Sequence, residues 1–500
     1  MEEREGRERT IARVNLVELL ADNGVGDAVA LITQKGATTT YSELRDLVAR
    51  FATKLLDRAV EPGARVVVAS GNDVELVVGY LAVLHVGAIA VPLNPNAPPA
   101  ELSRQLGVVT PRLAIAAGPA CPMLKAAGAD VLPIDLDDVG ETPTPRTDRA
   151  GDDVAVLLFT SGTAGTPKAA MLTHENLAAN IRQVLEHPGL RLEPSDRTLG
   201  VLPFHHVFGL NVVLGVTLAA GASVLLLDRF DPAEALAAIR REGVTVVAGV
   251  PTMYDAWLAL DPTDAPPDAF AGVRLAVSGA APLADETAQA FRERFGVIVH
   301  QGYGLTEAAP IVTTTAVDHR QPRAGSIGPP LPGVEVRIVD PDGSDVLAGD
   351  PGEVWVRGPN VFAGYWHDQE ATSRVLTPDG WLRTGDVAVV EHGELRLVDR
   401  VKDLIIVSGF NVYPVEVEDV LRAREEVHDA AVVGEPNPRT GEEVVAYVVP
   451  EPGHAIDVDA LRGACAHALA RYKCPSRIEI VDELPRSVAG KLVRRELRVG

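Results

Sequence analysis

The chain has 500 residues, of which 46% are hydrophobic and 23% are charged, a balance typical of a globular protein with roughly two to four domains. This composition excludes a mostly disordered chain, a collagen and a disulfide-stapled mini-protein. The 46 Lys and Arg residues against 69 Asp and Glu residues leave a net charge of −23, which argues against nucleic acid or an anionic membrane as a partner.

The sequence also bears on the cellular compartment. The three cysteines, Cys121, Cys465 and Cys474, form no CxxC pair, which predicts a reducing compartment and no structural zinc site. The N-terminus is highly charged and has no apolar segment, so we expect a cytoplasmic protein without a secretory signal. The stretch 198–227 carries no charged residue and is long enough to span a membrane. Glycines interrupt it, however, which predicts a buried helix followed by a buried strand and leaves contact with a membrane surface open.

Short runs rich in Val and Leu alternate with longer helical patterns through the first 320 residues or so. The runs are exemplified by 64–69, 154–159, 223–227, 244–250 and 275–278, and the helical patterns by 41–59 and 233–242. This alternation predicts an α/β fold, in which layered, mostly parallel sheets are covered on both faces. From about residue 325 to 399, short strands separated by Gly and Pro turns predict a small β subdomain. A new α/β unit begins after Asp399.

The segment 160–168, Thr-Ser-Gly-Thr-Ala-Gly-Thr-Pro-Lys, separates an apolar strand from a helical pattern that begins at His174. Glycines at a strand-to-helix turn let backbone N–H groups approach a phosphate, hydroxyls donate hydrogen bonds and a lysine neutralises charge. The spacing differs from that of a Walker A loop, because Pro167 precedes Lys168 and only two residues separate the glycines. The segment therefore indicates phosphate binding, and its alternative is an ordinary turn.

Four further segments carry side chains suited to chemistry. In 301–307, the Tyr303 ring can stack on a base and Glu307 can bind Mg²⁺; the alternative is a turn with a surface glutamate. In 380–386, Asp386 can accept hydrogen bonds from a ribose diol or form an Asx turn. The segment 399–414 is either functional or a charged linker. The segment 484–491 ends at Lys491, which follows a glycine and can reach a neighbouring site.

These five segments, in this order, resemble the adenylate-forming superfamily, which includes acyl-CoA synthetases, peptide-synthetase adenylation domains and firefly luciferase. The resemblance covers essentially the whole chain and is greatest to bacterial fatty-acyl-CoA ligases, on Val-Pro-Thr-Met-Tyr at 250–254 and Gly-Tyr-Trp at 364–366. It implies an enzyme that uses ATP, Mg²⁺ and CoA. The acid is activated to acyl-AMP with release of pyrophosphate and then transferred to CoA. It also implies an N-terminal adenylation domain over 1–399, a hinge at 400–402 with Lys402 at the family's hinge position, and a small mobile α+β C-terminal domain over 403–500.

The resemblance also implies roles for individual residues. The catalytic set is Lys491, Glu307, Thr163 and His206, with Glu307 as the metal ligand. The ATP phosphates would contact Thr160, Ser161, Gly162, Thr163, Ala164, Gly165 and Lys168, and the α-phosphate would contact Thr306. The adenine would be framed by Gly279, Ala280, Ala281, Gly302, Tyr303 and Gly304, and the ribose would be held by Asp386 and Arg400, while Gly409 would line the acceptor tunnel. Ala164 and Ala169 depart from the usual Thr and Gly of the family, and neither change removes a charge.

The acid itself is predicted from the segment 202–210, which resembles the family's acyl pocket and contains His206. No carboxylate occurs in 198–227 to pair with an ammonium group, and an unpaired buried ammonium costs several kcal/mol, so an amino acid is disfavoured. The absence of Lys and Arg there disfavours a dicarboxylate. We therefore expect a medium- or long-chain fatty acid, with an aryl or short-chain acid as the alternative.

Two other functions stay open. One is a fatty-acyl-AMP ligase that loads an acyl carrier protein, and the other is an inactive relative that only binds nucleotide or acyl chain. A homodimer is also left open.

Overall fold

The structure is a computed structural model. It describes residues 15–22, 26–160, 167–317, 322–323, 325–347, 349–391, 393–400, 403, 405–407, 410–412, 414–437, 439–469, 471–486 and 492–497. Within these ranges, no helix is long and apolar enough to cross a membrane.

The first layer is a six-stranded sheet of order β6-β5-β3-β4-β7-β8. Its strands are β3 Arg65–Ala69, β4 Ile89–Pro92, β5 Leu113–Ala116, β6 Val131–Pro133, β7 Val154–Thr160 and β8 Lys168–Thr173. All pairs are parallel except β7 with β8. The associated helices are α2 Tyr41–Asp57, α3 Val74–His85, α4 Pro99–Val109 and α5 Ala120–Ala126. Strands β4 and β5 are buried along their whole length, as their unbroken apolar sequence predicts.

The helix expected from His174 begins at that residue as α6, His174–Glu186. The strand β8, which was not expected, lies between the segment 160–168 and this helix and pairs antiparallel with β7, with Thr160 opposite Lys168. The segment therefore connects two strands. The short run 168–173 becomes a strand because the edge of β7 offers it hydrogen-bond partners, a tertiary effect that overrides local pattern.

The second layer is an eight-stranded sheet of order β14-β13-β12-β11-β9-β10-β1-β2. Its strands are β1 Val29–Thr33, β2 Thr38–Thr40, β9 Arg197–Gly200, β10 Ser223–Leu226, β11 Val246–Gly249, β12 Leu275–Ser278, β13 Val299–Gly304 and β14 Ile311–Thr314. Only the two edge strands, β2 and β14, run antiparallel to their neighbours. The helices of this part are α1 Leu16–Ala21, α6 His174–Glu186, α7 Thr217–Ala219, α8 Pro232–Glu242, α9 Pro251–Leu258 and α10 Asp285–Phe295.

The uncharged stretch 198–227 folds as predicted into a buried helical segment followed by a buried strand. The first part is a π-helix, η1 Phe208–Val216, which the apolar pattern alone does not distinguish from an α-helix. Buried side chains of η1 and of both sheets belong to one continuous core. The few aromatic residues concentrate beneath α9 and α10, where Trp257 lies edge-on to Tyr254 and Phe270 with ring centroids 5.7 and 5.2 Å apart.

A small antiparallel sheet follows, of order β15-β16-β17-β18. It comprises β15 Glu335–Val339, β16 Gly352–Arg357, β17 Leu382–Glu391 and β18 Glu394–Arg400, together with α11 Gln369–Val375. This sheet is the small β subdomain of the predicted fold class, while its bounds of about 325–399 stay a prediction.

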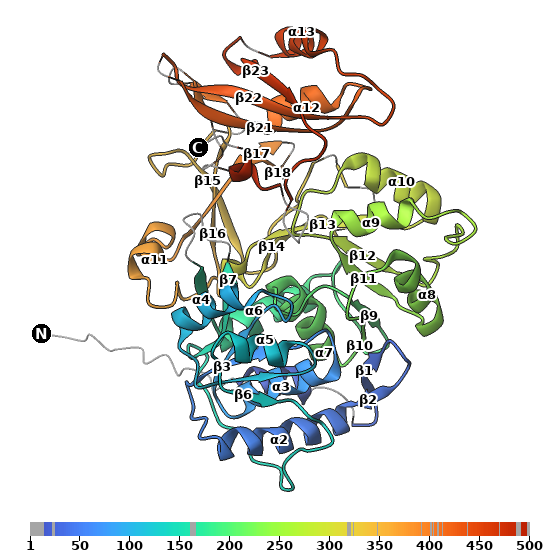
Figure 1. Cartoon of the computed structure of the whole chain (residues 1–500), viewed down its shortest axis with the longest axis vertical. Helices are drawn as coiled ribbons and strands as arrows, with labels where there is room; N and C mark the ends of the chain where they lie inside the picture. The colour runs from blue at the N-terminus through green and yellow to red at the C-terminus, as the bar shows by residue number, and fades with distance from the viewer. Residues whose placement is uncertain are drawn as a thin grey trace, which may run out of the picture.

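The C-terminal unit contains a five-stranded sheet with a core of its own. Four strands follow the order β20-β19-β22-β21, and β23 pairs with β22. The strands are β19 Ile405–Val407, β20 Phe410–Val412, β21 Val427–Asn437, β22 Gly441–Pro450 and β23 Arg477–Ile480, and the helices are α12 Pro414–Arg422 and α13 Val458–Ala468. Figure 1 shows this unit at one end of the molecule, beyond β17 and β18. The layered α/β sheets, the small β sheet and the α+β C-terminal unit agree with the predicted fold class.

Candidate active site

Glu307 lies in the short helical turn η2, Thr306–Ala308, which follows β13. The hydroxyl of Tyr365 donates a hydrogen bond to Glu307 Oε1 at 2.7 Å. The Nζ atom of Lys168, at the start of β8, lies 5.2 Å from the centre of the Tyr365 ring. Burial and the negative charge of Glu307 both raise the pKa of Tyr365, so the phenol stays protonated and acts as a donor. Tyr365 therefore connects the lysine of one sheet with the carboxylate of the other.

The backbone fixes this arrangement. Tyr365 forms an antiparallel bridge with Ala170 on β8, and Phe362 N donates to the carbonyl oxygen of Glu307 at 2.9 Å. The loop around residues 362–366 is thus attached to both sheets at once, which holds the Tyr365 ring between Lys168 and Glu307.

Tyr303 and Asp386 meet from different sheets. The Tyr303 hydroxyl, at the end of β13, donates to Asp386 Oδ2 on β17 at 2.7 Å, and each residue is 8% exposed. Thr384 Oγ1 accepts a hydrogen bond of 3.1 Å from Asp386 N. In the ladder, Asp386 stands opposite Arg400 of β18. The two residues expected at a ribose are therefore neighbours on adjacent strands.

Small residues bring the backbone close to Phe208 where β12 and β13 end. A Cβ atom on Gly279 would lie 3.0 Å from Phe208 Cε1 and 3.5 Å from the Gly302 oxygen. Ala280 has a φ of +68°, in the left-handed region. A Cβ atom on Gly304 would lie 2.0 Å from the Pro310 oxygen, so only glycine fits there. The carboxyl ends of parallel strands are the usual place for a ligand in an α/β sheet.

His205 and His206 lie in the segment between β9 and η1, with ring centroids 4.7 Å apart. Burial, with a smaller effect of His206, lowers the pKa of His205 to about 3, so its ring is neutral near pH 7. The side chain of His206 is exposed.

Sequence analysis missed several residues that hold these groups in place. The Asn72 amide donates to the carbonyl oxygens of Gly200 and Leu202 at 3.1 and 2.9 Å, and its Oδ1 accepts from Phe204 N at 3.2 Å. Asn211 on η1 donates to the oxygen of Ala309, next to η2, at 2.7 Å. Tyr365 belongs to this group as well: its motif at 364–366 contributed to the resemblance, but its contact with Glu307 was not foreseen. Asn211 is a polar residue within an apolar run, a signal that does not reveal the partner.

Several predicted site residues cannot be placed. Those that lie outside the described residues are Ser161, Gly162, Thr163, Ala164, Gly165, Lys402, Gly409 and Lys491. Arg400 is described by its backbone in β18. The described members lie at or next to the ends of β7, β8, β12 and β13, in η2 and in β17. They are Thr160, Lys168, Gly279, Ala280, Ala281, Gly302, Tyr303, Gly304, Thr306, Glu307 and Asp386.

The arrangement of a lysine, two carboxylates and two tyrosines suits a nucleotide-binding enzyme. Lys168 and Glu307 both contact Tyr365, and Asp386 accepts a hydrogen bond from Tyr303. Comparison with known families agrees. The model of the AMP-binding enzymes matches residues 21–366, and that of the AMP-binding enzyme C-terminal domain matches residues 416–491. The chain belongs to the AMP-binding enzymes of the adenylate-forming superfamily, and it is an AMP-forming acyl-CoA synthetase.

Individual relatives extend this result. The chain is 39% identical to a feruloyl-CoA synthase from Amycolatopsis sp over 473 residues, which cover 93% of this chain and 94% of that protein. It is 40% identical to a long-chain-fatty-acid–CoA ligase of Yersinia pestis over 363 residues, 71% of this chain and 62% of that protein. The crystal structure of ATP-bound MatB from Rhodopseudomonas palustris superposes with a TM-score of 0.90 at 34% identity, covering 97% of this chain and 98% of that chain.

Proposed function

We propose that this enzyme activates an aromatic carboxylic acid of the hydroxycinnamic type and transfers it to CoA. The observation that carries the proposal is the extent of the likeness to the feruloyl-CoA synthase, which runs through nearly the full length of both chains. The local geometry is compatible with such a substrate. The edge of the Phe208 ring lies close to Gly279 at the end of β12, which places an aromatic side chain near the predicted site.

A fatty acid is the second candidate. It is the substrate expected from the uncharged stretch 198–227, and the 40% identity to a long-chain-fatty-acid–CoA ligase favours it. Each CH₂ group that leaves water contributes about 0.8 kcal/mol to binding. For a fatty acid, KM should therefore fall as the acyl chain becomes longer.

The adenylation step brings two anions together, the acid and the α-phosphate of ATP. In the proposed mechanism Lys168 and Lys491 supply positive charge, Thr306 contacts the α-phosphate, and Asp386 with Arg400 holds the ribose. Tyr303 fixes the direction of the Asp386 carboxylate. Lys491 then leaves as the C-terminal domain turns at Lys402, and Gly409 and His206 line the path of the incoming thiol.

Magnesium fits this site as a partner of the nucleotide. In the described part of the chain, no cluster of three or more His, Cys, Asp or Glu side chains could hold a metal by itself. Mg²⁺ is commonly bound by one or two carboxylates together with substrate phosphates. Glu307 would provide the carboxylate, and the ion would neutralise phosphate charge. Tyr365 orients that carboxylate through Oε1.

The decisive experiment presents Mg·ATP and single acids to the purified protein, with and without CoA. The acids are ferulate, 4-coumarate, benzoate, acetate, octanoate, palmitate and malonate, and AMP, acyl-adenylate and acyl-CoA are followed by mass spectrometry. We expect the highest kcat/KM with ferulate or 4-coumarate. A preference for palmitate would favour the second candidate, and an adenylate unaffected by CoA would indicate a carrier protein. An enzyme that reacts with no acid of the panel would contradict the proposal.

A further inference from the structure

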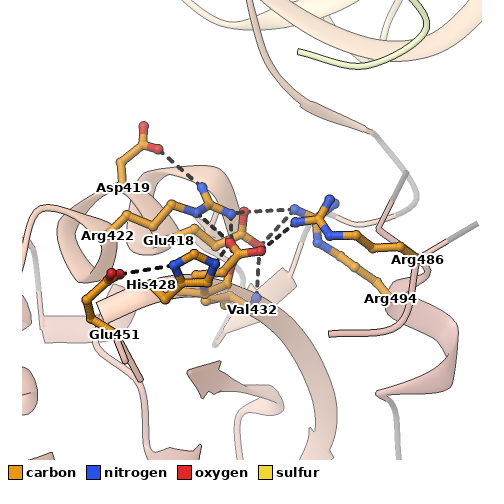
Figure 2. Close-up of polar contacts among 10 residues, drawn as sticks. Glu418, Asp419, Arg422, His428, Val432, Glu451, Arg486 and Arg494 are labelled. Atoms are coloured by element: carbon orange, nitrogen blue, oxygen red, sulfur yellow. Dashed lines mark hydrogen bonds and ion pairs between the residues drawn. The ribbon is translucent and has the colours of Figure 1, made fainter. Parts of the chain in front are cut away.

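The C-terminal unit contains a cluster of charged side chains around one buried carboxylate (Figure 2). Glu418 of α12 is only 1% exposed. Its Oε1 accepts a hydrogen bond from Val432 N of β21 at 2.8 Å. Arg494 Nη2 lies 2.8 and 3.0 Å from the two carboxylate oxygens, and Arg422 Nη2 lies 3.2 Å from Oε2.

Arg494 links this cluster to the start of the C-terminal unit. Its Nη1 lies 3.6 Å from Asp403 Oδ2, and both side chains are 15% exposed. Asp403 directly follows the expected hinge residue Lys402. One guanidinium therefore joins the end of the chain to α12 and to the residue after the hinge.

A second ion pair holds the chain shortly before Arg494. Arg486 Nη2 contacts Asp429 Oδ2 of β21, and Arg422 Nε donates to Asp429 Oδ1 at 3.1 Å. The backbone of Arg486 forms an antiparallel bridge with Leu492, and Val493 N donates to the Pro485 oxygen at 2.8 Å. The segments 484–486 and 492–494 thus lie side by side, both anchored to α12 and β21.

We propose that Glu418 is a positioning residue for adenylation, which acts through Arg494. The inference rests on the proposed function, in which Lys491 contacts the carboxylate and the α-phosphate. Lys491 directly precedes Leu492 in the sequence, so the anchored stretch 492–494 adjoins it. Because both oxygens of a buried carboxylate accept from one guanidinium, the pair fixes the orientation of the arginine side chain as well as its distance. The Arg494–Asp403 pair extends this anchoring to the residue that follows the expected hinge. The segment 492–494 and α12 would therefore move together when the C-terminal domain rotates.

The test separates the two half-reactions. Glu418→Gln keeps the shape and an acceptor for Val432 N but removes the charge, and Arg494→Gln removes the other partner. The matched control is Arg462→Gln on α13, whose arginine forms an exposed pair with Asp459 at 3.4 Å. Adenylation is measured as pyrophosphate release, with kcat and the KM for ATP determined separately. Thioester formation is measured from the pre-made adenylate of the best acid and CoA, and Tm is recorded for each variant.

We expect the kcat of adenylation to fall in Glu418→Gln and Arg494→Gln on the order of tenfold to hundredfold, as a displaced catalytic group requires. The KM for ATP and thioester formation from pre-made adenylate should stay within about twofold of wild type, and Arg462→Gln should match wild type. Arg494→Lys keeps the charge but cannot bind both carboxylate oxygens in a fork. Its kcat should therefore lie between that of wild type and that of Arg494→Gln.

Two outcomes would overturn the inference. Loss of both half-reactions in parallel with a lower Tm would show a purely structural role, and unchanged adenylation would show no role at all. If Glu418→Gln fails to fold, Arg494→Lys and Arg494→Gln decide by the same measurements. Failure of the proposed function is distinguishable, because then wild type itself forms no product from the acids. If wild type reacts and Lys491→Ala loses adenylation while Glu418→Gln does not, only the positioning role is wrong.

Discussion

The hydroxyl of Tyr365 donates to Glu307 at 2.7 Å, and this bond joins a loop next to the small β sheet with the end of β13. Tyr365→Phe removes the donor but keeps the ring over which Lys168 lies. We expect the half-saturating Mg²⁺ concentration to rise and kcat/KM for ATP to fall about tenfold, about 1.4 kcal/mol, since a hydrogen bond to a charged group contributes roughly 1.5–3 kcal/mol. Magnesium titrations of pyrophosphate release check this. An unchanged dependence on Mg²⁺ would show that Tyr365 does not assist Glu307 in binding the ion.

The Tyr303–Asp386 pair leads to a prediction about the ribose. If Asp386 holds the ribose hydroxyls, wild type should discriminate strongly against 2′-deoxy-ATP. Asp386→Asn should raise the KM for ATP about tenfold to hundredfold and reduce the preference for ATP over the deoxy analogue. Steady-state kinetics with both nucleotides provide the measurement. Equal discrimination in the variant and wild type would place the ribose elsewhere.

Gly279, which the family resemblance places at the adenine, also lies close to Phe208, so a substitution there tests whether it borders the acid instead. Gly279→Ala places a methyl group 3.0 Å from Phe208 Cε1, closer than most real Cβ contacts, so the ring must shift. We expect kcat/KM for ferulate to fall about tenfold or more relative to acetate, because overpacking costs roughly 1–3 kcal/mol. The ratio of the two acids is the measured quantity, and a proportional loss for both would indicate that Gly279 does not border the acid.

The environment of His174 leads to a prediction of how the free energy of unfolding depends on pH. It is fully buried, and its Nδ1 accepts a hydrogen bond from Leu16 N at 3.0 Å. Burial, with a smaller effect of Arg149, lowers the pKa of His174 from 6.5 to about 4. A histidine with a lowered folded pKa stabilises the fold above the unfolded pKa of 6.5, and this contribution is lost as the pH falls toward 4. The loss amounts to up to about 3 kcal/mol.

His174→Asn keeps an acceptor but does not titrate. The difference in unfolding free energy between pH 7.5 and pH 4.5 should therefore be smaller in this variant than in wild type, as urea titrations at both values would show. Parallel pH profiles of the two proteins would contradict the assignment.

The sequence carries the α/β alternation, the small β sheet and the C-terminal unit because hydrophobic periodicity is a local signal. Glu307 and Asp386 could also be selected as candidates from the neighbouring sequence, since each follows a strand or turn with a recognisable residue pattern. Tyr365, Asn72 and Asn211 could not be found in this way, because their partners are distant in the chain and meet only when the sheets pack. The strand β8 was missed for a different reason: its partner β7 is close in the chain, but β8 contains Ala169 and Ala170, which have low β propensity.

The three-sheet origin of the site has a consequence for synthesis on the ribosome. Lys168 belongs to the six-stranded sheet, Tyr303 and Glu307 end a strand of the eight-stranded sheet, and Asp386 lies on the small β sheet. A nascent chain that ends before β17 lacks the carboxylate that Tyr303 contacts. Because β17 begins at residue 382 of 500, the emerging polypeptide lacks part of the proposed nucleotide site until roughly three quarters of the chain has been translated. Nucleotide can therefore stabilise the product of synthesis only late, after the last of the three sheets has left the exit tunnel.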